Sequence, residues 1–196
     1  MHRPVLITPP AAPVVTLEEA KAHLRVDHAA DDALIEGLIG AATGHLDGWT
    51  GVLGRCLVEQ TWRQEYDGFA RDLHLPLGPV IAATSVTWRS AAGTLATVSP
   101  SAYDLRTDAG GRSCVRFDAG YSFPTGLHES RAVAVTYRTG HEAVGVPAPL
   151  RAAVLLMVGD LYAFRESGGS GTVAFSSPTS LTVNNLIAPY RRRVAG

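Results

Sequence analysis

The sequence predicts an α+β protein: a small helical bundle with an antiparallel β meander inserted between its second and third helices, plus a C-terminal docking tail. Two observations support this class. Apolar residues recur with a helical period toward both ends of the chain, whereas between residues 57 and 140 the period changes to two. Turn-forming residues also divide that middle part into short runs, as expected for short antiparallel strands.

These periods divide the chain into four parts. Residues 1–56 hold the N-terminal helices of the bundle, and residues 57–140 form the inserted β unit. Residues 141–166 contain a buried bundle helix, and residues 167–196 form a flexible loop followed by the docking segment. The bundle is therefore completed by sequence far from its first helices.

The first helix follows an extended stretch, because four prolines exclude a helix in residues 1–15. Thr16 and Glu19 have the spacing of a capping box, which predicts a short helix ending near Arg25.

A second helix is predicted from a cap at Asp31 or Asp32 to about Trp49. Its apolar residues lie within about 100° of one another on a helical wheel; they are Ile35, Leu38, Ile39, Ala42, Leu46 and Trp49. Its glycines lie on nearly the opposite side; they are Gly37, Gly40, Gly44 and Gly48.

These glycines need a reason, because each one inside a helix costs about 0.5–1 kcal/mol relative to alanine. A backbone that approaches the helix closely would provide it. That backbone belongs either to another helix of the same chain or to a neighbouring subunit. The alternative is that the glycines are neutral changes in a tolerant helix.

The middle part reads as five or six short strands, in the runs LVEQTWRQEY, SVTW, SAYDLR, SCVRFD and AVAVTY. Helix returns after a proline pair. It begins near Pro149, and residues 152–159 are apolar all round, which is typical of a helix buried on most sides. The chain ends with a short amphipathic segment that contains Pro189 and three consecutive arginines.

Composition excludes several classes of protein. The 196 residues carry a formal net charge of -1, so no global field attracts the chain to nucleic acid or to an anionic membrane. The N-terminus lacks the apolar run of a signal peptide, and no apolar stretch is long enough to span a bilayer. We expect a soluble, cytoplasmic product in which Cys56 and Cys114 are thiols rather than a disulfide.

Catalytic motifs are weak throughout. HEAVG, at residues 141–145, lacks the second histidine of a zincin helix, and GGSG, at 168–171, lacks the strand and the Lys-Ser/Thr of a phosphate loop. A helix cap explains Asp31 and Asp32 without acid–base chemistry. We therefore predict no catalytic residues, no metal site and no cofactor.

In its order of segments, the chain resembles the head–tail connector (adaptor) proteins of tailed bacteriophages, most closely those of long-tailed phages and of gene transfer agents. The resemblance covers about residues 14–193. It rests on TLEEAKAHLRVD, DDALIEGLIGAA, WTGVLGRCLVEQTW, LPLGPVIAATSV, YDLR, AVAVTYRTGH, VPAPLRAAVLLMVGDLYAFRE and LIAPYRR. The chain departs from the pattern at His141, where many relatives have an aromatic residue, and in the long loop 166–180.

The resemblance implies a homo-oligomer, a dodecameric ring beneath the portal protein of a virion or phage-like particle. Such a ring extends the channel for double-stranded DNA without sequence-specific contact and carries the stopper or tail-completion protein. It assembles in the cytoplasm of the bacterial host and needs no membrane. In relatives the C-terminal segment grips the portal, which assigns this contact to Leu186, Ile187, Tyr190, Arg191, Arg192 and Arg193.

A ring also needs a heterologous interface between neighbouring subunits, and the four glycines of the second helix are our candidate for one half of it. Two alternatives remain open at this point. One is another tail-completion or stopper protein, a class that usually lacks a buried helix like that starting near Pro149. The other is a small-ligand enzyme or sugar-binding module that uses the β unit.

Overall fold

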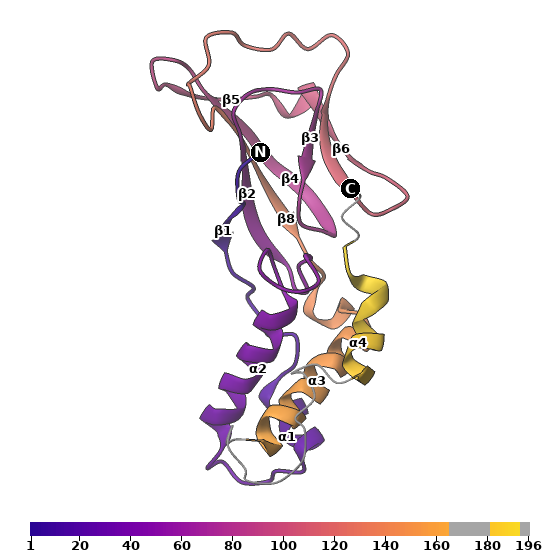
Figure 1. Ribbon diagram of the computed structural model, residues 1–196. Helices are drawn as coiled ribbons and strands as arrows, with labels where there is room; N and C mark the ends of the chain where they lie inside the picture. Colours follow the sequence, from indigo (N-terminus) through magenta and orange to yellow (C-terminus); the bar gives the residue numbers. More distant parts are fainter. Residues whose placement is uncertain (165–180, 193–196) are drawn as a thin grey trace. The chain divides into compact units, whose positions relative to one another are not determined.

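The computed structural model describes residues 1–164 and 181–192 (Figure 1). The chain divides into two compact units. Met1–Ala11 and Val58–His141 form a β unit, and Ala12–Leu57 and Glu142–Gly196 form a helical unit. The predicted α+β class with antiparallel strands is confirmed. One assignment differs from the prediction, because the first eleven residues, which we placed with the bundle, belong to the β unit.

The helical unit contains α1 (Leu17–Leu24), α2 (Asp32–Leu46), α3 (Ala148–Ala163) and α4 (Leu181–Ile187), with short 3₁₀ turns at η2 (Ala143–Gly145) and η3 (Ala188–Tyr190). Helix α3 packs on α1, α2 and α4. Its buried residues are Leu150, Ala153, Val154, Met157 and Val158. The remaining apolar positions of α3 between residues 151 and 159 are half-buried, so the helix is central to this unit but not covered all round.

The start of α1 follows the predicted capping box. The Thr16 hydroxyl accepts from the Glu19 backbone N–H at 3.2 Å, and the Glu19 carboxylate accepts from the Thr16 N–H at 2.9 Å. Arg151 of α3 donates to the same carboxylate and, at 3.1 Å, to the Val14 carbonyl oxygen. These bonds hold the beginning of α1 against α3.

The β unit contains two antiparallel sheets. The five-stranded sheet has the order β1-β2-β8-β4-β5, formed by Val5–Thr8, Gln60–Tyr66, Val133–Thr139, Val80–Arg89 and Leu95–Thr97. The three-stranded sheet has the order β3-β7-β6, formed by Asp72–Leu75, Ser113–Phe117 and Tyr103–Thr107, and η1 (Pro100–Ala102) precedes β6. The predicted simple meander is wrong, because the last strand, β8, lies between β2 and β4.

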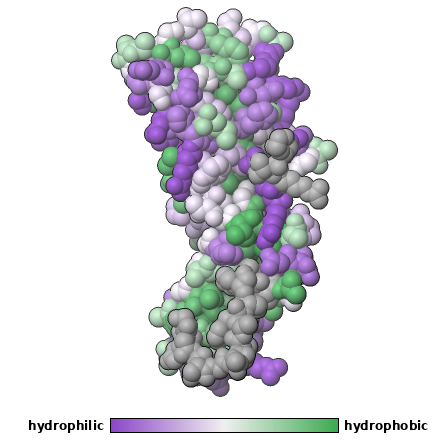
Figure 2. Space-filling view, in the orientation of Figure 1, coloured by the Kyte–Doolittle hydropathy of each residue, from purple (hydrophilic) through white to green (hydrophobic). Residues whose placement is uncertain are grey.

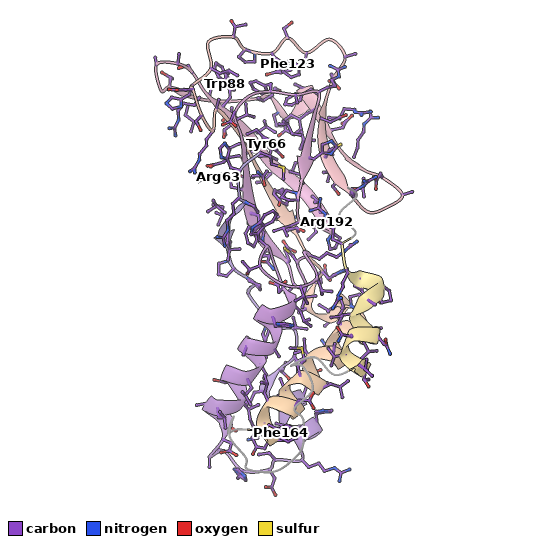
Figure 3. The ribbon with its side chains drawn as sticks, in the orientation of Figure 1. Arg63, Tyr66, Trp88, Phe123, Phe164 and Arg192 are labelled. Atoms are coloured by element: carbon purple, nitrogen blue, oxygen red, sulfur yellow. The ribbon has the colours of Figure 1, made fainter. Side chains whose placement is uncertain are left out.

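Each sheet buries one face in a common core. Along β2 every second residue is buried, which gives the alternation expected of a half-buried strand. Two buried glutamines lie on this inner face, and both are hydrogen bonded: Gln60 accepts from the Trp62 indole N–H at 3.0 Å, and Gln64 donates to the His2 carbonyl oxygen at 2.6 Å. Tyr66, labelled in Figure 3, donates from its hydroxyl to the His74 carbonyl oxygen of the other sheet.

Neither Cys56 nor Cys114 is in a disulfide. Cys56 is buried, and Cys114 is half-buried on β7, where desolvation and the nearby Asp72 carboxylate raise the pKa of its thiol. In the described part of the chain, the helices are too short or too polar to cross a membrane.

Candidate interaction surfaces

The outward face of α2 is made of small residues. Ile35, Ile39, Ala42 and Leu46 are buried, as predicted from the helical wheel. Gly37, Gly40 and Gly44 are exposed, and a Cβ atom added at any of the three would meet no atom within 4 Å. Within residues 1–164 and 181–192, therefore, no side chain or backbone packs closely against these glycines, which leave a bare backbone face along most of the helix.

Two further small residues belong to this face. Ala33 and Ala41 are exposed, and their positions on the helix lie within about 100° of the three glycines. They were not predicted, because only a glycine carries the helix penalty that singled out this face. We call the surface formed by Ala33, Gly37, Gly40, Ala41 and Gly44 the small-residue face of α2.

Gly48 does not belong to the small-residue face. Helix α2 ends at Leu46, earlier than the predicted end near Trp49. Gly48 is buried in the following turn with φ 74°, a left-handed conformation that suits glycine, and its N–H donates to the Arg55 carbonyl oxygen at 2.7 Å. Trp49 likewise lies outside the helix and is 38% exposed, so it does not extend the apolar stripe.

The two aspartates at the start of α2 connect this helix to its neighbours. Asp31 occupies the cap position, but its side chain makes no capping bond and instead accepts from the Tyr162 hydroxyl of α3. Asp32 pairs with Lys21 of α1 at 2.6 Å. These contacts, rather than the predicted side-chain cap, fix the buried face of α2 toward α1 and α3.

The C-terminal segment is partly inside the helical unit. Val183 and Ile187 are both fully buried, with the spacing of four residues that places them on one face of α4. Ile187 was predicted to contact a portal protein, but in this structure its side chain belongs to the subunit's own core. Leu186 and Tyr190 are half-buried, so both keep some accessible surface.

Two of the three arginines can be placed. Arg191 is exposed, and its guanidinium donates to the Asn184 side-chain oxygen at 2.9 Å. The Arg192 backbone N–H donates to the Leu53 carbonyl oxygen at 2.9 Å, which anchors the segment that follows η3, and Figure 3 labels this residue. Arg193 lies outside the described residues.

The β unit has a hollow of about 460 Å³ lined by Arg71, Arg106, Arg116, Phe117, Asp118 and Ala119. Arg116 donates to both carboxylate oxygens of Asp72 at 2.6 Å each, and this pair holds the pKa of Asp72 below its ordinary value. Arg71 donates to the Asp118 carbonyl oxygen at 2.6 Å. The groups that line the hollow are thus cations, an acid and apolar atoms, with no nucleophile beside a base.

A metal site is not formed by the described residues either, since no three His, Cys, Asp or Glu residues among them are close enough to share an ion. On the face of the molecule drawn in Figure 2, hydrophobic and hydrophilic side chains are interspersed over the β unit. The surfaces best suited to interaction are therefore the small-residue face of α2 and the C-terminal segment.

Comparison with known proteins relates part of the chain to one protein family. Residues 14–67 match the model of the phage gp6-like head–tail connector protein family. This match confirms the resemblance seen in the sequence, and it spans α1, α2 and β2. No curated protein matches the chain.

Solved structures of similar fold come from gene transfer agent particles. One chain from the neck of an empty particle with C6 symmetry and one from a native virion each share 23% identity with this protein, at a TM-score of 0.77. In both cases the match covers 100% of this chain and 98% of the other. A chain from the neck of a native particle with C12 symmetry shares 22% identity over 97% of this chain and 98% of its own length, with a TM-score of 0.66. The fold of this protein is that of these neck chains.

Proposed function

We propose that this protein is a head–tail connector, a non-enzymatic subunit of a ring beneath the portal protein of a phage or phage-like particle. One observation carries the proposal: the family match over residues 14–67 and the neck-protein fold over the whole chain point to the same kind of protein. The helical bundle, the inserted β unit and the C-terminal segment provide the surfaces for its contacts with neighbouring subunits and with the portal. At the head–tail interface, the ring extends the DNA channel and carries the stopper.

A ring of twelve copies is the arrangement we favour, because one similar chain comes from a particle neck computed with C12 symmetry, and six divides twelve for the neck computed with C6 symmetry. The chain's formal net charge of -1 suits a channel wall along which DNA slides, because the chain as a whole does not attract phosphate strongly.

The small-residue face of α2 forms one half of the contact between neighbouring subunits. Its glycines meet none of the described residues of their own subunit, and a bare backbone lets a second backbone approach closely. A cyclic ring requires two different surfaces on each subunit, so the other half lies elsewhere on the neighbour.

The experiment that tests this contact replaces Gly40 and Gly44 together with leucine. Both side chains would point into open space, so the isolated chain should fold with an unchanged circular dichroism spectrum. Rings that assemble on the portal should disappear from negative-stain micrographs, because the added side chains hold the neighbour away. Ala22→Leu on the exposed side of α1 is the matched control and should leave the rings intact. Normal rings from the double variant would contradict the interface.

The portal contact is proposed for the exposed end of the C-terminal segment, with Arg191 and Arg192 paired to acids of the portal. Removing the whole segment would be a poor test, because it would also remove Val183 and Ile187 from the core. We therefore choose the charge reversal Arg191→Glu at the exposed position. It should abolish co-purification with the portal while the unfolding transition stays in place, and full co-purification would exclude this contact.

A further inference from the structure

The two sheets of the β unit differ in how their edges are protected. In the three-stranded sheet, each edge strand carries charged or ionisable side chains: Asp72 and His74 on β3, and Asp104 and Arg106 on β6. Charges on an edge strand oppose pairing with another chain, and natural proteins use them for this purpose. These two edges are built to stay unpaired.

The five-stranded sheet lacks this protection at both edges. Strand β1 reads VLIT and strand β5 reads LAT, so neither carries a charge. Val5, Leu6 and Ile7 are 41%, 42% and 47% exposed, and Leu95 is 64% exposed. Val5 and Leu6 point to opposite faces, and the strand is irregular between Leu6 and Thr8, so apolar surface is accessible on both faces of β1.

Each of these edge strands also has backbone N–H and C=O groups that pair with no other strand of the described residues. Strand β1 is paired with β2 alone, and β5 with β4 alone, among the strands of the described residues. The N–H and C=O groups on the outer side of each strand are therefore open to a further strand. An uncharged, apolar edge with open backbone groups is a template for strand addition.

We propose that β1 of one copy pairs with β5 of the next copy, so that the five-stranded sheet continues from subunit to subunit. The proposal rests on the ring proposed above and gives the β unit its own contact within it. The two strands are similar in length, with four residues in β1 and three in β5.

The topology fixes the direction of this pairing. All neighbours in the sheet are antiparallel, so β1, β8 and β5 run in the same direction. Successive copies in a large ring differ by a small rotation, which preserves strand direction. The β5–β1 ladder between copies is therefore parallel.

A second copy accounts for both edges at once. A strand from a different protein would use one edge and leave the other open, at risk of unwanted association. A closed ring of head-to-tail contacts uses one edge of the five-stranded sheet against the opposite edge of the next copy, and it leaves neither edge of that sheet free. For this reason we assign both edges to copies of this chain.

Disulfide trapping tests the pairing directly. Within one subunit β1 and β5 are separated by three strands, about 19 Å at the usual spacing, so a bond between them can form only between copies. We would mix full-length chains that carry Ala96→Cys with chains that carry either Val5→Cys or Leu6→Cys, which sample both faces of β1. Cys114 is replaced by serine throughout, and the buried Cys56 is kept.

The matched control joins the edges of the other sheet, with His74→Cys on β3 and Arg106→Cys on β6, both exposed. At the highest soluble chain concentration, at least one β1–β5 mixture should give mixed disulfide dimers at about tenfold the control yield, because contact raises the local thiol concentration. A yield equal to the control would overturn the pairing.

Electron microscopy of wild-type chain assembled on the portal separates the two proposals. Rings without an excess of β1–β5 disulfide would overturn the strand pairing and leave the connector function standing. An excess of β1–β5 disulfide without rings would support the pairing and count against the connector. As a second arm, Leu95→Lys should remove the rings, whereas Val144→Lys, at the 89% exposed position in the helical unit, should not.

Discussion

Gly140 and the glycines of α2 show two opposite uses of the same residue. At Gly140, φ is 112°, and an added Cβ atom would lie 2.2 Å from the Val58 carbonyl oxygen. At Gly37, Gly40 and Gly44, an added Cβ atom would meet nothing within 4 Å. The fold of the described residues requires the first glycine, whereas it places no atom against the other three.

This difference indicates that the glycines of α2 serve a contact with another molecule. Glycine lowers helix stability, so three of them in one exposed helix face are a cost that the isolated subunit does not recover. A close approach by another subunit would recover it. Substitutions at Gly140, in the helical unit and at Gly40 should differ accordingly in their effects on stability and assembly.

Gly140→Ala should severely destabilise the β unit, by more than about 4 kcal/mol, since the new methyl group meets backbone atoms that cannot rotate away. Hydrogen exchange monitored by mass spectrometry should show lost protection in residues 58–141. Gly120→Ala, where a Cβ atom has open space, is the control and should change little. Equal stability of the two variants would show that Gly140 is not required.

Ile187→Ala should lower the free energy of unfolding of the helical unit by about 3 kcal/mol, because it leaves a cavity at a fully buried site on α4. Leu186→Ala, next to it and only half-buried, should cost clearly less. Urea unfolding followed by circular dichroism compares the two variants. If Leu186→Ala proved more destabilising than Ile187→Ala, the buried face of α4 would be wrongly assigned.

Glu19→Gln should cost about 1 kcal/mol at neutral pH, since it keeps the helix cap but removes the charge that faces Arg151, and the two-fifths exposure of Glu19 limits the gain from that pair. The Thr16 backbone N–H and then Arg151 hold the pKa of Glu19 below its ordinary value. The carboxylate therefore stabilises the folded chain above its ordinary pKa, and this contribution is lost as the pH falls through the lowered value.

The measurement is the urea midpoint of both proteins at neutral and at acid pH. The difference should vanish in acid, where the wild-type carboxyl is also uncharged. A difference that persisted at low pH would mean that the substitution acts through the cap and not through the ion pair.

The helices could be predicted because their signals are local. Thr16 and Glu19 define the start of α1 within four residues, and the apolar stripe of α2 identifies its buried face. The end of α2 was placed too late, although Gly48, just after the last buried residue, is the kind of stop signal that closes a helix. Because Gly48 lies beyond the end of α2, only Gly37, Gly40 and Gly44 remain candidates for the subunit contact.

The strand order and the role of α4 could not be predicted in the same way. Strand β8 lies between β2 and β4 because residues far apart in sequence pair, such as Trp62 with Tyr137. Helix α4 spans only seven residues, too few for a period to show that Val183 and Ile187 face inward. The edge strands β1 and β5 are too short to be predicted from a period, and they form by pairing with β2 and β4. Their exposed apolar residues can therefore be recognised as sheet edges only in the folded structure.

The smallest predicted effect has the opposite sign to the others. Gly40→Ala should stabilise the isolated chain by about 0.5 kcal/mol, because alanine restricts the unfolded chain and its methyl group meets no atom of the residues that the structure describes. The same substitution should weaken ring assembly, since even one methyl group separates two backbones in close contact. Thermal unfolding of the free chain and quantitative micrographs of rings on the portal would show the two changes together. A variant that is more stable and assembles as well as wild type would mean that the glycine is a neutral change, and the contrast with Gly140 would then say nothing about assembly.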